Sequence, residues 1–277
     1  KIWSRSLGDG YSAIVADRGA LYTMYHRSAS DGSPREAVIA VDADSGKTKW
    51  EYHYDTPFPS EFMTDYGPGP NATPLIVGSR LFTVGSTAKL HALDAATGKV
   101  LWSRDLYEEF QLKRLGMKTH RGYSSSPIAY KDTVILPLGG RGQAVAAFAQ
   151  KDGSLRWKAQ DFELTPSSPV LIELEGHQQL VVFMSREIAG LDPDNGDLLW
   201  SYPHKTEWDL NILTPVWGED GLLFVSSAYD SGSRVVRLSR HQGETLVENV
   251  WYSRRMRIHV GTAIRLGDIV HTSSGDF

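Results

Sequence analysis

The sequence predicts an all-β fold, a β-propeller built from four-stranded antiparallel blades. One observation is a motif that recurs along the chain and is clearest in residues 40–50 and 92–102, where alanine, aspartate, glycine, lysine and tryptophan occupy matching positions. A second is the spacing of the tryptophans that end successive copies. They lie roughly 43 to 55 residues apart, which is typical of propeller blades and not of helical or leucine-rich repeats.

The strands of each repeat follow one order, which the second copy illustrates. Pro74 opens the first strand, where its missing N–H removes no ladder hydrogen bond. β-branched and aromatic residues in 80–84 predict the second strand, and the alternating pattern of 90–94 predicts the third. Gly98 supplies a positive φ in the turn that leads to the fourth strand and to Trp102. We expect this indole to dock between adjacent blades, where it buries a large area and its N–H finds a partner.

The same template predicts five complete repeats and a partial one within a single domain, 1–277. The complete repeats cover about 11–52, 72–104, 126–159, 167–202 and 214–253, and the partial repeat covers 262–277. The predicted turn glycines include Gly46, Gly98, Gly153 and Gly196, and the predicted docking tryptophans are Trp50, Trp102, Trp157, Trp200 and Trp251. Trp3 matches the end of a further copy, so we expect the chain to be part of a longer ring.

Composition excludes several classes of protein. The 277 residues are 41% hydrophobic and carry a formal net charge of -4, so no basic surface for nucleic acid is expected. No stretch approaches the length of a transmembrane helix. The chain has no cysteine, which excludes a disulfide or a thiolate metal site. It opens without methionine, and we expect upstream residues that could include a signal peptide.

The motif Ala-x-Asp-x-x-x-Gly-Lys-x-x-Trp resembles the tryptophan-docking motif of the pyrroloquinoline quinone (PQQ) type propeller repeat. Residues 40–50 and 92–102 match it most strictly, whereas Ala149 replaces the aspartate in the third copy and Gly190 replaces the alanine in the fourth. This family includes the quinoprotein alcohol dehydrogenases and the propeller lipoprotein BamB, and the chain is most similar to bacterial PQQ-like repeat proteins. The resemblance implies an eight-bladed ring, a location in the periplasm or elsewhere outside the cytoplasm, and a possible upstream lipid anchor.

The resemblance carries over no catalytic residue and no cofactor. Quinoprotein dehydrogenases use an aspartate base and calcium ligands that no residue here matches, and many use a disulfide that a chain without cysteine cannot form. Residues 192–197 resemble a calcium loop, but they lack the later glutamate and coincide with a repeat hairpin. We therefore predict no metal and no cofactor, with PQQ and calcium only under an alternative function.

Function is expected in the long connections between the fourth strand of one repeat and the first strand of the next. Aromatic and arginine side chains gather there, which is typical of recognition surfaces. The candidate binding residues are Arg121, Tyr123, Trp208, Asp209, Asn211, Arg254, Arg255 and His259. The arginine cluster near residue 255 favours an acidic partner, with salt-sensitive binding.

Three functions stay open on this sequence. The first is a non-catalytic scaffold, similar to BamB, that binds a protein or peptide. The second is a PQQ-dependent oxidoreductase acting on alcohols or sugars, and the third is a small-molecule or carbohydrate binder in a central funnel.

Overall fold

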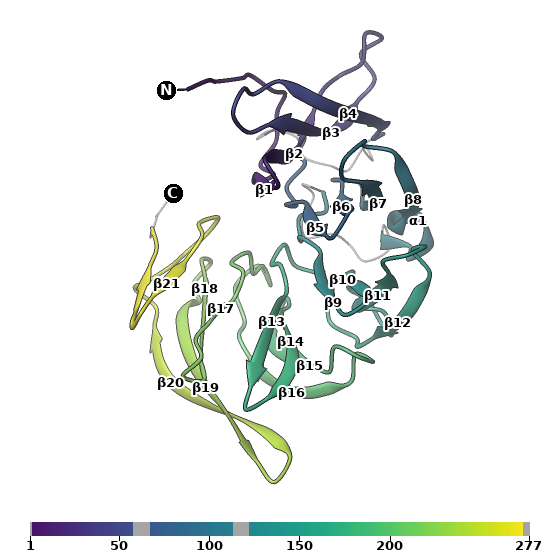
Figure 1. The fold of residues 1–277 in the computed structure, drawn as a ribbon. Coiled ribbons are helices and arrows are strands. Elements are labelled where there is room, and N and C mark those ends of the chain that lie inside the picture. The colour runs from purple at the N-terminus through teal and green to yellow at the C-terminus, as the bar shows by residue number, and fades with distance from the viewer. Residues whose placement is uncertain (1, 58–66, 113–121, 274–277) are drawn as a thin grey trace. The chain divides into compact units, whose positions relative to one another are not determined.

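The computed structural model describes residues 2–57, 67–112 and 122–273, in which antiparallel β-sheet accounts for nearly all regular structure (Figure 1). Five four-stranded sheets and one two-stranded sheet follow one another, and each joins strands that are consecutive in sequence. The chain divides into two compact units, Lys1–Ile135 with Phe148–Leu155 (unit 1) and Leu136–Ala147 with Arg156–Phe277 (unit 2). Each unit is described by itself.

The strands run through the six sheets in chain order. The first sheet contains β1 (Val15–Asp17), β2 (Ala20–His26), β3 (Arg35–Asp42) and β4 (Thr48–Asp55). The second contains β5 (Leu75–Val77), β6 (Arg80–Val84), β7 (Lys89–Asp94) and β8 (Val100–Asp105), and the third contains β9 (Ile128–Tyr130), β10 (Thr133–Pro137), β11 (Val145–Ala149) and β12 (Leu155–Ala159). The fourth contains β13 (Val170–Leu174), β14 (His177–Phe183), β15 (Glu187–Leu191) and β16 (Leu198–Pro203). The fifth contains β17 (Val216–Trp217), β18 (Leu222–Ser227), β19 (Gly232–His241) and β20 (Glu244–Ser253), and the sixth contains β21 (Ile264–Leu266) and β22 (Ile269–His271).

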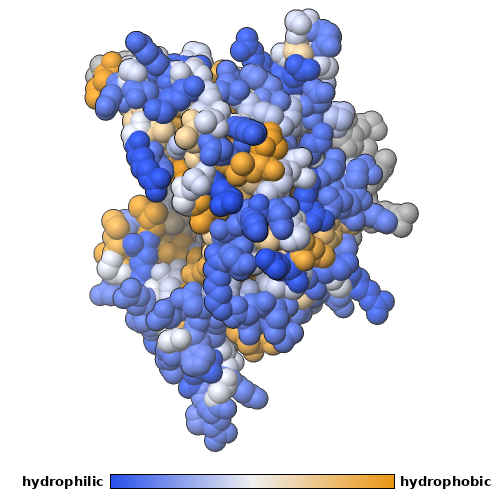
Figure 2. Space-filling model, turned by 45° about the vertical axis from the view of Figure 1, so that its right-hand side comes forward, coloured by the Kyte–Doolittle hydropathy of each residue, from blue (hydrophilic) through white to orange (hydrophobic). Residues whose placement is uncertain are grey.

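Burial follows the position of a strand in its sheet. In the second sheet the central strands β6 and β7 are almost wholly buried, whereas the fourth strand of a sheet has both covered and exposed residues, as in β16. A short helix, α1 (Leu106–Glu109), interrupts the connection after the second sheet. Most of the surface seen in Figure 2 is hydrophilic, and its hydrophobic residues form separate small patches. The apolar residues of the central strands therefore form the cores between sheets.

The aspartate and glycine of the repeat shape the hairpin between the third and fourth strands. The Asp94 carboxylate accepts hydrogen bonds from the Thr97 backbone N–H at 2.9 Å and from its hydroxyl at 2.7 Å. Asp42 binds Ser45 in the same way, at 2.9 and 2.7 Å. Gly98 follows with a φ of +73°, a conformation that side chains resist. The recurring Asp-x-x-Ser/Thr-Gly pattern is thus a capped turn.

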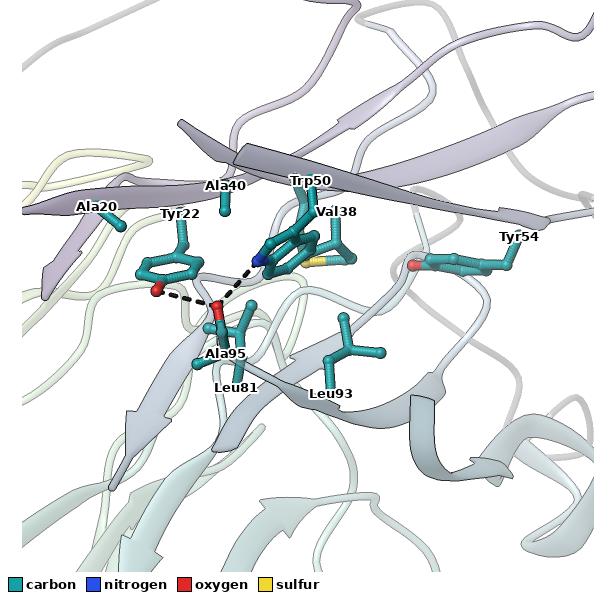
Figure 3. Packing of buried hydrophobic residues seen from close by; sticks show 10 residues of the cluster. Ala20, Tyr22, Val38, Ala40, Trp50, Tyr54, Leu81, Leu93 and Ala95 are labelled. Carbon is teal, nitrogen blue, oxygen red and sulfur yellow. Dashed lines mark hydrogen bonds between the residues drawn. The ribbon is translucent and has the colours of Figure 1, made fainter. Parts of the chain in front are cut away.

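Three indoles of unit 1 contact the next hairpin in one common geometry. The Trp50 N–H donates to the Ala95 carbonyl at 2.9 Å, and Tyr22 donates its hydroxyl hydrogen to the same oxygen at 3.2 Å (Figure 3). A Cβ on Gly98 would lie 2.5 Å from the Trp50 ring, so only glycine leaves room for the indole. The corresponding donors in the neighbouring copies are Trp3, to Ala43 at 2.9 Å, and Trp102, to Gln150 at 3.1 Å.

The indoles of unit 2 depart from this geometry. Trp157 packs on Gly196, but its buried N–H has no acceptor among the residues that the structure describes. Trp200 is turned toward its own sheet, over Gly190, and donates to the Gln179 side chain at 2.7 Å. Gln179 in turn donates to the Thr245 hydroxyl at 2.9 Å, in the hairpin of the next sheet.

Trp251 occupies the matching register position in β20, opposite Val235 at the bulge, but its surroundings differ. It is 41% exposed, and among the residues described no hairpin glycine packs on its ring. Within the described residues the sheet that follows has only the two strands β21 and β22, so the docking role of Trp251 stays a prediction.

Candidate functional site

Three connections meet at one end of unit 2, and together we call them the loop surface: residues 204–211, 228–231 and 254–259. The Glu207 backbone N–H donates to the Tyr229 carbonyl at 3.0 Å. The Tyr229 hydroxyl contacts the His259 ring nitrogen, and Asp230 pairs with Arg257 at 3.7 Å. The 228–231 turn thus joins two connections that are about fifty residues apart in sequence, as the blade spacing of a propeller requires.

The segment 204–211 holds Trp208 in a defined turn. The Leu210 N–H donates to the Thr206 hydroxyl at 2.7 Å, and Asp209 adopts a φ of +50°. Arg186 pairs with the Asp209 carboxylate at 2.9 Å, which fixes the segment against the preceding sheet. Trp208 itself is 61% exposed. An exposed indole on a hydrogen-bonded turn is a preformed contact group.

Buried polar groups support this segment from beneath. Asn211 is fully buried, and its side-chain amide donates to the Met184 carbonyl at 2.7 Å and the Ser185 carbonyl at 3.2 Å. Ser227 donates its hydroxyl hydrogen to the Asn211 side-chain oxygen. Asn211 therefore positions the connection and does not present its side chain to a partner.

His204 links the same segment to the 228–231 turn. Its Nε2 lies 2.9 Å from the Ser231 hydroxyl, and its ring packs edge-on against Phe183. Burial, reinforced by the positive charge of Arg234, lowers the pKa of His204 to about 4. The imidazole is therefore neutral at neutral pH, and it is a structural contact under the loop surface.

The 228–231 turn and the 254–259 segment are packed backbone to backbone. Tyr229 and Asp230 both have positive φ values, 55° and 61°. A Cβ added to Gly232 would lie 2.8 Å from the Arg254 Cα, so that glycine lets the two segments touch. The run Tyr-Asp-Ser-Gly is a turn signal in the sequence, and it is the feature that could have indicated this part of the site.

Only one of the two predicted binding residues of unit 1 lies in the described part of the chain. Arg121 lies outside the described residues. Tyr123 is buried, its backbone N–H donates to the Ser86 carbonyl at 2.7 Å, and burial raises the pKa of its hydroxyl. Residues 122–126 are therefore held against the second sheet.

A buried carboxyl group lies close by in unit 1. Glu36 accepts hydrogen bonds from the Tyr54 hydroxyl at 2.6 Å and from the Ser86 N–H at 2.9 Å, and it also contacts the Ser86 hydroxyl. Burial raises the pKa of this carboxyl above its ordinary value. His91 packs 4.4 Å from the Tyr54 ring, centroid to centroid, and burial lowers the pKa of its imidazole to about 4. Glu36 thus joins the first sheet to the second, a role that the sequence did not suggest.

A known protein family matches most of the chain. The family described as outer membrane protein assembly factor BamB, a PQQ-repeat family, matches residues 34–276. The chain belongs to this family.

Solved structures of the same fold include two types of protein. BamB from Moraxella catarrhalis aligns with a TM-score of 0.61 and 17% identity over 96% of this chain and 70% of that one. A europium-containing methanol dehydrogenase aligns with a TM-score of 0.57 and 14% identity over 92% of this chain and 63% of that one. The quinohemoprotein alcohol dehydrogenase from Comamonas testosteroni gives 0.52 and 18% over 87% and 43%. At these identities the likeness shows the β-propeller fold.

A curated relative is similar over a shorter stretch. The dehydrogenase subunit of the quinone alcohol dehydrogenase from Gluconobacter oxydans strain 621H is 43% identical over 86 residues. That stretch is 30% of this chain and 10% of the relative, so the chain spans about a tenth of that protein's length.

The acidic and histidine side chains of the described residues do not form a group of three that could hold a metal ion. Calcium takes six to eight oxygen ligands, largely from carboxylates. In 2–57, 67–112 and 122–273 no three histidine, aspartate or glutamate side chains gather as a metal would require. The most deeply buried carboxyl, that of Glu36, has both oxygens engaged by Tyr54 and Ser86.

Among residues 2–57, 67–112 and 122–273, no helix has the length and apolar composition that a membrane span needs.

Proposed function

We propose that this protein is a non-catalytic binding scaffold outside the cytoplasm, which holds a protein or peptide partner on its loop surface. The observation that carries the proposal is the construction of that surface. Trp208 is exposed, yet the turn that carries it is tied down by the Thr206, Asp209 and Asn211 contacts. A rigid exposed aromatic group loses little conformational entropy on binding, which is the property of an interface anchor.

Family membership supports the same function. The matching family is described as an assembly factor, and BamB is the solved structure that this chain covers to 70%. A propeller fold by itself hosts many activities, so the argument for binding rests on the loop surface. Location outside the cytoplasm rests on the resemblance to extracytoplasmic members of the family, and an upstream lipid anchor would be consistent with it.

Site-specific crosslinking tests the proposal. A photo-reactive amino acid placed at Trp208 is expected to give discrete adducts with a protein partner in cells, because this position contacts the partner directly. The matched control is the same amino acid at Trp251, an exposed tryptophan on an outer strand. Equal adducts at both positions, or none at position 208, would contradict a binding role for the loop surface.

A quinone-dependent oxidoreductase is the second candidate, and the 43% identity to a quinone alcohol dehydrogenase subunit favours it. This function predicts that purified protein takes up PQQ, with a quinone absorbance band and dye reduction in the presence of an alcohol or a sugar. Uptake of PQQ with turnover would replace the scaffold proposal. A carbohydrate or small-molecule binder would instead show ligand-dependent thermal stabilisation without turnover.

A further inference from the structure

We propose that the partner segment held by the loop surface is acidic and carries an apolar side chain. This inference rests on the proposed binding function and adds to it the chemistry of the partner. It follows from the distribution of charge over the three connections, because the acids and bases of the loop surface are paired unequally.

Two arginines of the region are already neutralised by neighbouring acids. Arg186 pairs with Asp209 at 2.9 Å, and Arg257 pairs with Asp230 at 3.7 Å. In each pair the carboxylate is bound to an arginine of this chain. They hold the connections in place, and they add no net charge that a partner could use.

Three cations remain. Lys205, Arg254 and Arg255 are exposed, and none of their side-chain nitrogens forms an ion pair with an acid of the described chain. Of the three acids in these connections, Asp209 and Asp230 form the ion pairs above, and Glu207 is left to oppose the cations. The residual charge of the loop surface is therefore positive, although the formal net charge of the whole protein is -4. A local excess of positive charge on an acidic protein selects an acidic partner and steers its approach.

The segments that carry the arginines and the exposed indole both contact the 228–231 turn. The backbone of Arg254 packs on Gly232 at the end of the 228–231 turn, and the Arg257 guanidinium donates to the Arg254 carbonyl at 2.9 Å. The same turn accepts the Glu207 N–H, one residue before Trp208. An arginine-rich segment and an exposed tryptophan thus flank a common turn. Guanidinium groups bind carboxylates through paired hydrogen bonds, and an indole accepts an apolar side chain.

A defined peptide probe tests this chemistry. The probe is a fluorescein-labelled peptide of alternating glutamate and leucine, and its control is the peptide of the same length that alternates lysine and leucine. We expect the full chain to bind the acidic probe, with an affinity that falls as salt is added, and to bind the basic probe at least about tenfold more weakly, since like charges repel.

Charge reversal then locates the site. The double variant Arg254→Glu/Arg255→Glu should lower affinity for the acidic probe about tenfold or more, since two attractions become repulsions. The matched control, Arg237→Glu/Arg240→Glu, changes the charge equally at the far end of β19 and should leave binding unchanged. Trp208→Ala should weaken binding several-fold without changing its salt dependence, because the indole contributes apolar contact.

The failure of this inference is distinguishable from failure of the proposed function. Equal binding of both probes, or equal losses in the two double variants, would overturn an acidic partner. If crosslinks at position 208 persisted under that outcome, the scaffold function would stand with a partner of different chemistry. Circular dichroism and the urea midpoint of each variant establish that it is folded.

Discussion

Adjacent sheets are connected by different hydrogen bonds in the two units. We compare the direct joint, between the first and second sheets of unit 1, with the relay joint, between the fourth and fifth sheets of unit 2. In the first, the Trp50 N–H reaches directly across to a backbone carbonyl of the next hairpin, at Ala95. In the second, Trp200 donates to Gln179 of its own sheet, and Gln179 donates to Thr245 of the next sheet. A backbone acceptor depends only on the fold, whereas a side-chain relay depends on the identity of one residue.

The opposite end of each joint shows a parallel difference. In both joints a serine in the turn after the second strand of one sheet contacts a buried titratable side chain from the sheet before it. Ser86 contacts Glu36, and Ser231 contacts His204. One group is an acid whose pKa is raised by burial, and the other is a base whose pKa is lowered by burial. Both are therefore shifted toward their neutral forms, which is the general effect of removing a charge from water.

The largest effect is expected from substitution of a hairpin glycine in the direct joint. Gly98→Ala places a methyl group 2.5 Å from the Trp50 ring at a φ of +73°, so it combines overpacking with backbone strain. We expect a loss of about 3 kcal/mol in the free energy of unfolding, measured by urea denaturation. The control is Gly78→Ala, at a φ of +60° with open space around it, which should cost only about 1 kcal/mol. Equal losses would show that the indole contact adds nothing to the strain.

Acid should lower the free energy of unfolding through His204, which lies at the joint between the fourth and fifth sheets. The pKa of this histidine in the folded protein, about 4, lies below its ordinary value of 6.5, so the unfolded chain binds more protons between these values. Stability is therefore fully present above pH 6.5 and is lost as the pH falls toward 4, by at most about 3 kcal/mol. Urea unfolding at pH 7, 6 and 5 measures the slope, and His204→Gln should flatten it.

Other buried titratable groups, among them His91 and Glu36 of unit 1, set the background of that measurement. His91 in unit 1 has the same lowered pKa, so the flattening by His204→Gln is expected to be partial. Glu36 has the opposite sign. Its raised pKa gives stability that is complete below its ordinary value of 4.5 and is lost as the pH rises through the value in the folded protein. A His204→Gln variant with an unchanged acid slope would disprove the assignment.

The relay should be sensitive to its central residue. Gln179→Met keeps the length of the side chain but leaves the Trp200 N–H without an acceptor, and we expect a loss of about 2 kcal/mol. Gln178→Met is the matched control, because Gln178 is exposed and its side chain bonds to the exposed Glu173, so its loss should be below about 0.5 kcal/mol. A loss at Gln179 no larger than at Gln178 would mean that the relay does not hold the joint. Hydrogen exchange of the β14 and β20 amides would report the loosening locally.

The comparison also shows what the sequence could and could not predict. The repeat predicted the sheets and the hairpins, because Asp94 and Gly98 act on their own turn. The repeat does not predict the orientation of the Trp200 indole, because that orientation depends on the missing Cβ of Gly190 and on Gln179, which lies on another strand. Local chemistry is readable from adjacent residues, whereas pairings between strands require the fold.

The candidate site was predictable to a similar degree. Trp208 and Arg255 are exposed on a connection, as polar and aromatic loop residues often are. Tyr123 and Asn211, taken from the same kind of segment, are buried supports. The sequence locates the connection, but it does not reveal which side chains the backbone hydrogen bonds turn inward.

One substitution in the fourth hairpin bears on how this repeat changes over evolutionary time. Ala43, Ala95 and Gln150 each donate their backbone N–H to a neighbouring turn, and each accepts an indole N–H at its own backbone carbonyl. Pro193 occupies the same position after Asp192 and has no N–H, so its peptide lacks that anchor, and the Trp157 N–H is left without an acceptor. Because each repeat touches only its neighbours, the loss stays confined to a single interface. Individual copies can thus accumulate mutations and specialise while the rest of the array preserves the architecture.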